Sequence, residues 1–144
     1  MKKKPIDLYY SENHLWIHLE DNKEAVLGVT DHLLANWHEI IHIDLPKKGK
    51  NITADTPLGE IESSDNLITL ITPVNGKVLI TNAACLKNPH TILTSPYEEG
   101  WLIKIKLADV SELNTLMDHG EYEDFVEEME EDTADEDSFN ENDY

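Results

Sequence analysis

The chain has little cysteine, few basic residues and no long apolar segment. Cys85 is the only cysteine among 144 residues, which excludes an intramolecular disulfide and a thiolate metal cluster. Lys and Arg number 11 against 30 Asp and Glu, so a phosphate backbone would repel the chain. No segment approaches the roughly 18 apolar residues of a membrane span, and no apolar run follows the N-terminal lysines as it would in a signal peptide. We therefore expect a cytoplasmic protein that binds neither nucleic acid nor membranes.

The negative charge is concentrated towards the C-terminus. Fourteen of the 30 acidic residues lie from Asp118 onward, where there is no Lys or Arg, and the first 117 residues carry a formal charge of only −5. Residues 128–144 contain too few apolar side chains to offset the entropy of ordering, so we expect a disordered acidic tail. Such a tail either keeps the chain soluble or steers it towards a basic partner. Residues 9–127 should form one domain, preceded by an N-terminal extension over residues 1–8.

Alternation of apolar and polar residues predicts several short strands. They are expected in a hairpin from Leu15 to Thr30, in "IIHIDLP", at the start of "GKVLITNAACL" before a loop, and in "WLIKIKL". In "GEIESSDNLITLITPVNG", residues 59–76, two strand-forming runs flank Ser64, Asp65 and Asn66, which favour turns. This pattern predicts a second hairpin with Asp65 and Asn66 near its exposed tip. Many short strands and few helical turns indicate a mainly β domain, a small sandwich or barrel.

Helical spacing occurs in two segments. In "TDHLLANWHEII" five apolar residues recur every three or four positions, which predicts a helix capped by Thr30 or Asp31. In "DVSELNTLMDHGEYEDFVEEME" the expected N-cap is Ser111, and Gly120 is expected to divide the segment into two short helices. The stretch "NPHTILTSPYEEG" is rich in helix breakers and should be irregular.

Motifs for catalysis or metal binding are missing. The sequence contains no Gly-rich phosphate loop and no supported Ser/His/Asp spacing. His38 and His42 are four residues apart, but the second lies in an expected strand, so we expect no metal site there. We interpret Cys85 as a small core residue, the usual role of a lone cysteine. We therefore expect neither an enzyme nor a metalloprotein.

The order of the motifs resembles that of the glycine cleavage system H protein family. Over residues 9 to about 127 the similar motifs are "NHLWI", "LGVTDHLL", "HIDLP", "GEIES", "TPVNGKVLITN", "SPYEEGWLIKIKL" and an acidic terminal helix. The resemblance implies a lipoyl-domain-like fold, a barrel-sandwich hybrid of two small antiparallel sheets with short helices and a C-terminal helix. It also implies a carrier role, in which a lysine at the hairpin tip bears a lipoyl arm that shuttles an aminomethyl group between the enzymes of glycine decarboxylation.

The sequence departs from that family at the lipoyl attachment point. Matching Glu62 and Ser63 to the family motif needs no gap as far as Gly76 and places Asp65 at the lipoyl-lysine position. An aspartate cannot form the lipoyl amide, because the ligase needs an exposed primary amine. The nearest replacement amine, Lys77, follows the next bend and is not at the tip. We therefore expect no catalytic residue in this chain and no lipoate attached at Asp65.

Two further positions differ from the family pattern. The residue before the motif tryptophan is typically acidic in the family and helps to hold the loaded, cationic methylamine, whereas here it is Leu15. His38 stands where the family pattern has glycine. Leu15 offers neither charge nor acceptor, although it could equally be a surface residue of an edge strand, and His38 a solvated side chain.

Three functional hypotheses remain. The favoured one is an H-like protein without lipoate, a non-catalytic binding module whose protein partners are glycine cleavage or lipoate-metabolism enzymes. It is favoured because "SPYEEGW" and "IDLP" are kept. The second is a functional lipoyl carrier that uses a displaced lysine such as Lys77. The third is an unrelated adaptor that acts through its acidic tail.

Overall fold

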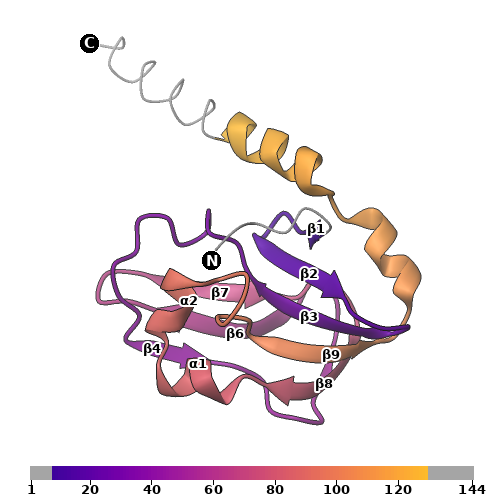
Figure 1. Ribbon diagram of the computed structural model, residues 1–144, viewed down its shortest axis with the longest axis horizontal. Helices are drawn as coiled ribbons and strands as arrows, with labels where there is room; N and C mark the ends of the chain where they lie inside the picture. Colours follow the sequence, from indigo (N-terminus) through magenta and orange to yellow (C-terminus); the bar gives the residue numbers. More distant parts are fainter. Residues whose placement is uncertain (1–7, 130–144) are drawn as a thin grey trace.

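Two antiparallel sheets make up most of the protein. The computed structural model describes residues 8–129. The strands and helices along the chain are β1 (Tyr9–Tyr10), β2 (Leu15–Leu19), β3 (Glu24–Val29), β4 (His42–Asp44), β5 (Asn51–Ile52), β6 (Pro57–Glu62), β7 (Leu67–Ile71), β8 (Gly76–Thr81), α1 (Ala83–Lys87), α2 (His90–Thr94), β9 (Ile103–Leu107) and the 3-10 helix η1 (Val110–Thr115). A further helix, here called the C-terminal helix, covers residues 119–129 (Figure 1).

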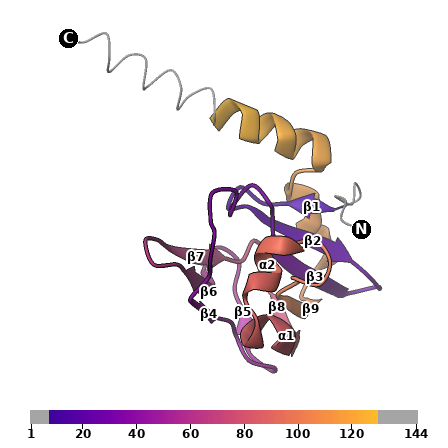
Figure 2. The same ribbon diagram turned by 60° about the vertical axis from the view of Figure 1, so that its left-hand side comes forward.

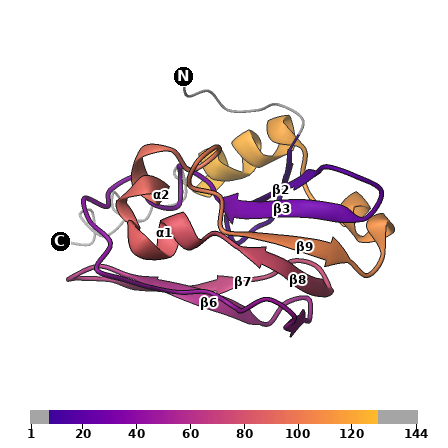
Figure 3. The same ribbon diagram turned by 60° about the horizontal axis from the view of Figure 1, so that its bottom comes forward.

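The larger sheet has the strand order β1-β2-β3-β9-β8-β5 and the smaller one the order β4-β6-β7. Every strand pair is antiparallel. Figure 3 shows the strands β6 and β7 as a separate layer beneath β9, β3 and β2. The expected mainly β fold with two small antiparallel sheets is confirmed.

The core lies between the two sheets. Ile17, Leu27 and Ile105 from the larger sheet and Ile61 and Leu70 from the smaller one belong to a single buried cluster. On β6, β7 and β9 these buried positions lie between more exposed residues, as expected for a sheet with one buried face. Burying one Leu or Ile side chain contributes about 1.5–3 kcal/mol. The alternation that predicts the strands is therefore also what holds the two layers together.

Most expected strands are present. The hairpin predicted from Leu15 to Thr30 consists of β2 and β3, and the one predicted over residues 59–76 consists of β6 and β7. The strands expected in "IIHIDLP", "GKVLITNAACL" and "WLIKIKL" are β4, β8 and β9. These predictions are confirmed.

The prediction of a helix after Thr30 is wrong. Residues 30–41, the β3–β4 loop, form turns over residues 31–36 and irregular backbone after them. Their hydrogen bonds join residues three apart, as in Leu33 N to Thr30 O and Trp37 N to Leu34 O. Tight turns also bring every third or fourth side chain to one side, so Leu34 is buried without the i to i−4 bonds of an α-helix. The apolar spacing could not distinguish the two.

Two short helices occur where loops or irregular structure were expected. The helix α1 begins after Asn82, whose side chain accepts a hydrogen bond from the Ala84 amide, and it contains the buried Cys85. The helix α2 follows Pro89 and buries Ile92. Each has five residues, which is too short for a helical period to show in the sequence.

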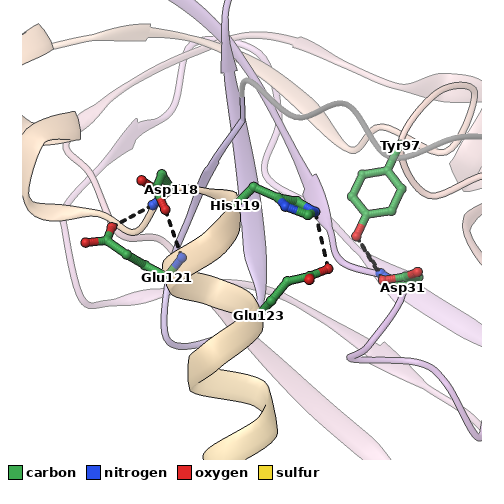
Figure 4. Close-up of polar contacts among 6 residues, drawn as sticks. All are labelled: Asp31, Tyr97, Asp118, His119, Glu121 and Glu123. Atoms are coloured by element: carbon green, nitrogen blue, oxygen red, sulfur yellow. Dashed lines mark hydrogen bonds and ion pairs between the residues drawn. The ribbon is translucent and has the colours of Figure 1, made fainter.

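The C-terminal segment contains two helical pieces, but their boundaries differ from the prediction. Asp109, not Ser111, caps η1 by accepting a hydrogen bond from the Ser111 amide. The break falls before Asp118, whose carboxylate and amide bond to the amide and carboxylate of Glu121 (Figure 4). This reciprocal pair is a capping box, so the C-terminal helix begins there and Gly120 lies inside it.

The predicted extension and tail fall mostly beyond the described residues. Residues 1–7 and 130–144 are outside them, and residues 128–129 continue the C-terminal helix. None of the helices between residues 8 and 129 has the length and apolar character needed to cross a membrane.

Candidate functional site

The hairpin between β6 and β7 ends in a two-residue turn. The Ser63 amide donates to the Asn66 carbonyl over 2.8 Å, so Ser64 and Asp65 occupy the centre of the turn and Asn66 closes it. The Ser63 hydroxyl accepts hydrogen bonds from the amides of Asp65 and Asn66, at 3.2 and 3.0 Å. Ser64, Asp65 and Asn66 are exposed, which confirms the expected tip. The backbone amides of the tip therefore have acceptors other than the side chain of Asp65.

A second contact fixes the tip from outside the hairpin. Glu39, in the β3–β4 loop, accepts a hydrogen bond from the Ser64 amide over 3.2 Å. Hydrogen bonding to Ser64 holds the pKa of the exposed Glu39 carboxyl below its usual range. The Ile41 amide also donates to the carbonyl of Glu62, the last residue of β6. Figure 2 shows the β6–β7 turn projecting from the body beside this loop.

Apolar side chains flank the exposed tip. Ile41 is 58% exposed and Leu67, opposite Glu62 in the hairpin, is 57% exposed. Leu67 begins β7 directly after the tip, and the Ile41 amide bonds to the carbonyl of Glu62 just before it. The tip therefore presents a carboxylate, Asp65, next to two uncovered aliphatic side chains.

Leu15 lies in the core and not on a surface. It is 0% exposed and pairs with Val29, the residue before the β3–β4 loop begins. The interpretation of Leu15 as a surface residue of an edge strand is therefore wrong, because β2 is flanked by β1 and β3. Asp65 lies in the turn of the smaller sheet's β6–β7 hairpin, whereas Leu15 lies on β2 of the larger sheet.

The other expected positions are dispersed. His38 is exposed in the β3–β4 loop, and His42 is exposed on β4 opposite Glu62. Among residues 8–129 no three His, Cys, Asp or Glu side chains are grouped to hold a metal ion. Lys77 is exposed on β8, where it pairs with Asn51 and Lys106 in the larger sheet, away from the tip.

Cys85 is a core residue, as the sequence indicates. Its side chain is fully buried and its sulfur lies 3.3 Å from the Trp101 carbonyl oxygen. Burial raises the pKa of the Cys85 thiol to about 11. The thiol therefore stays protonated at neutral pH and is a poor nucleophile.

A pocket that the sequence did not reveal lies between the β3–β4 loop and α2. It has a volume of about 450 Å³ and its lining includes Thr30, Asp31, Leu34, Trp37, Ile92 and Tyr97. The Tyr97 hydroxyl donates to the Asp31 carboxylate over 2.9 Å and accepts from the Asp31 amide over 3.2 Å (Figure 4). Burial raises the pKa of Tyr97 above its usual range, so this hydroxyl remains a donor. The bond joins the two segments that form the pocket.

No local pattern could have identified this pocket. Asp31 and Tyr97 are 66 residues apart and come from segments without regular alternation. The segment "SPYEEGW" was notable only as part of the family resemblance, and its Tyr97 and Glu98 line the pocket wall. The loop from Thr30 to Ile41 thus contributes both to this pocket and, through Glu39, to the hairpin tip.

Comparisons with known proteins agree on one family. The family described as "Glycine cleavage H-protein" matches residues 8–129. The glycine cleavage system H protein of Brevibacillus brevis is 40% identical over 124 residues, covering 86% of this chain and 98% of the relative. The mitochondrial glycine cleavage system H protein 2 of Arabidopsis thaliana is 35% identical over 122 residues, covering 85% of this chain and 78% of the relative.

A solved structure supports the same assignment. The crystal structure of a glycine cleavage system H protein from Mycobacterium marinum has a TM-score of 0.74 and 29% identity, and the match covers 83% of this chain and 95% of that one. The lipoyl-domain-like arrangement implied by the sequence resemblance is therefore confirmed. The family match, the relatives and the shared fold show that this chain belongs to the glycine cleavage H-protein family.

Proposed function

We propose that this member of the H-protein family carries no lipoyl arm and serves as a non-catalytic binding module for glycine cleavage or lipoate-metabolism enzymes. H proteins are non-catalytic lipoyl carriers, so the chain is not itself an enzyme. The observation that carries the proposal is the exposed Asp65 at the centre of the hairpin turn. A carboxylate there offers no amine to an activated lipoyl group.

The surroundings of Asp65 support a binding role for the hairpin. The turn keeps a defined shape through the Ser63 hydroxyl and the Glu39 carboxylate. Ile41 and Leu67 add uncovered apolar surface beside it. Exposed aliphatic side chains next to a fixed polar tip suit contact with another protein. We place the protein in the cytoplasm, with other proteins as its partners. Nucleic acid and membranes are not expected partners, since acidic residues greatly outnumber basic ones.

The alternative carrier must use another lysine. Lys77 is exposed, but it lies within β8 between β5 and β9 and not in a turn. A lipoate ligase that recognises a hairpin tip would meet a different backbone shape there. The third hypothesis, an adaptor acting through the acidic tail, concerns residues mostly beyond the described range.

The test is lipoylation followed by intact mass. Incubation of the full chain with a lipoate ligase, lipoate and ATP should leave its mass unchanged, whereas Asp65→Lys should gain one lipoyl group. Asn66→Lys, one residue further on, is the register control and should gain less. Lipoylation of the unaltered chain would contradict the proposal, and its loss in Lys77→Arg would establish the displaced-lysine carrier instead.

A further inference from the structure

Tyr122 is the most buried contact between the C-terminal helix and the β-body. Tyr122 is only 5% exposed and its ring stacks on that of Tyr10, with centroids 4.6 Å apart. Phe125 and Val126, on the same side of the helix, pack partly buried against the cluster that includes Tyr10 and Trp16. Other residues of the helix, among them Glu121, Asp124 and Glu128, are exposed. The helix thus docks through a narrow aromatic stripe.

The Tyr122 hydroxyl connects three distant parts of the chain. It lies 2.8 Å from Nδ1 of His14 and 2.8 Å from Oγ1 of Thr30. Thr30 is fully buried at the end of β3, and His14 precedes β2 with a φ of 68°. A positive φ is uncommon for histidine and persists only where the surroundings fix it. The three side chains form a continuous polar link between the helix and the open end of the β2–β3 hairpin, where the chain enters β2 and leaves β3.

Charge at His14 is unfavourable in this position. Burial lowers the pKa of His14, and the neighbouring His32 lowers it further by a smaller amount. The His14 and His32 rings are 5.1 Å apart, and Tyr122 and Phe125 close the other sides of His14 at 5.8 and 6.1 Å. The hydrogen bond itself survives protonation, since Tyr122 can reverse its donor direction towards Thr30. The cost of protonation therefore comes from desolvation and from His32.

Two other ionisable groups near the helix contacts are His119 and Asp31. His119 pairs with Glu123 at 3.3 Å, within the same helix (Figure 4), so this pair does not depend on docking. The His119 and Tyr10 rings also lie in a T-shaped arrangement, with centroids 6.0 Å apart. Asp31, in the β3–β4 loop, is a negative charge near Tyr122. His14 is therefore the group whose protonation opposes docking.

We propose that His14, Thr30 and Tyr122 form a pH-sensitive latch that holds the C-terminal helix on the β-body while His14 is neutral and releases it when His14 takes up a proton. A histidine whose folded pKa is depressed contributes its full stability above the unfolded value, about 6.5, and loses it as pH falls below that value. Release uncovers the apolar surface around Tyr10 and frees Thr30, where the β3–β4 loop begins.

Amide hydrogen exchange on the full chain tests the latch. Exchange of residues 122–129 is compared at pH 7.5 and 5.0 after correction for intrinsic rates. Protection of the helix should fall roughly threefold or more on acidification, relative to the core strands β3 and β9. In His14→Asn, which tolerates a positive φ and carries no charge, this fall should disappear. His119→Gln should keep it.

Two further variants make the test decisive. Tyr122→Phe keeps the ring stacked on Tyr10 but loses the hydroxyl, so its helix should be less protected at both pH values. His32→Gln keeps His14 and removes the neighbouring charge, so the pH dependence should shrink without loss of docking at pH 7.5. If protection in the unaltered chain does not change with pH, or if either His14→Asn or His32→Gln retains the full change, the latch is refuted.

Discussion

The carboxylate of Glu39 accepts a hydrogen bond from the backbone amide of Ser64, which joins the β3–β4 loop to the tip of the β6–β7 hairpin. The same loop begins at Thr30, the partner of Tyr122, and forms part of the pocket with Tyr97. One connection between the two sheets therefore contacts the C-terminal helix, the segment after α2 and the hairpin tip.

Removal of the Glu39 carboxylate should loosen the tip without unfolding the protein. In Glu39→Ala the Ser64 amide should exchange faster, measured by NMR, while the melting temperature stays nearly constant because both groups are exposed. In the unaltered chain the protection should be present above the ordinary carboxyl pKa of 4.5 and lost as pH falls below it, since the folded pKa is lowered. Glu12→Ala, at another exposed acid, should leave Ser64 exchange unchanged.

The half-buried Ser63 hydroxyl should contribute measurably to stability. Ser63→Ala leaves the amides of Asp65 and Asn66 without their acceptor and should lower the free energy of unfolding by about 0.5–1.5 kcal/mol. Urea denaturation measures this difference. Ser63→Thr retains a hydroxyl and should recover most of the loss; an equal loss in both variants would show that the hydroxyl is not the cause.

An acidic residue at position 15 should not be tolerated in this chain. Leu15 is fully buried against the core, so Leu15→Glu should lower the free energy of unfolding at pH 7 by about 3–5 kcal/mol. Burial raises the folded pKa of such a carboxyl, so the loss should be smaller at pH 5 than at pH 7. Leu15→Met, of similar volume, should cost less than about 1.5 kcal/mol. A Leu15→Glu variant as stable as Leu15→Met would contradict this.

Replacement of Gly28 should destabilise the larger sheet. A Cβ at Gly28 would overlap the Trp16 indole, which lies across it on β2 and donates from Nε1 to the Pro96 carbonyl over 3.1 Å. Gly28→Ala should therefore lower the free energy of unfolding by about 1–3 kcal/mol and shift the tryptophan emission. Gly120→Ala, inside a helix with free space around the new methyl group, should be neutral or stabilising by up to about 1 kcal/mol.

The sequence predicts the strands well because a strand with one buried face leaves a period of two, as in β7 and β9. The prediction fails in the β3–β4 loop. There Leu33, Leu34 and Trp37 have helical spacing, but the backbone makes successive turns closed by hydrogen bonds between residues three apart. The tip residue Asp65 could be located from its neighbours alone. The pocket and the helix contact could not, since His14 and Tyr122 are 108 residues apart and meet only through the tertiary fold.

The construction of the hairpin tip has an evolutionary consequence. The amides of Ser64, Asp65 and Asn66 find their acceptors in Ser63 and Glu39, so the side chain at position 65 takes no part in folding the turn. Selection for a folded protein therefore does not constrain that residue, and a carrier and a non-carrier can differ there while sharing every other contact. Descendants could gain or lose the arm at this one position without passing through an unstable ancestor.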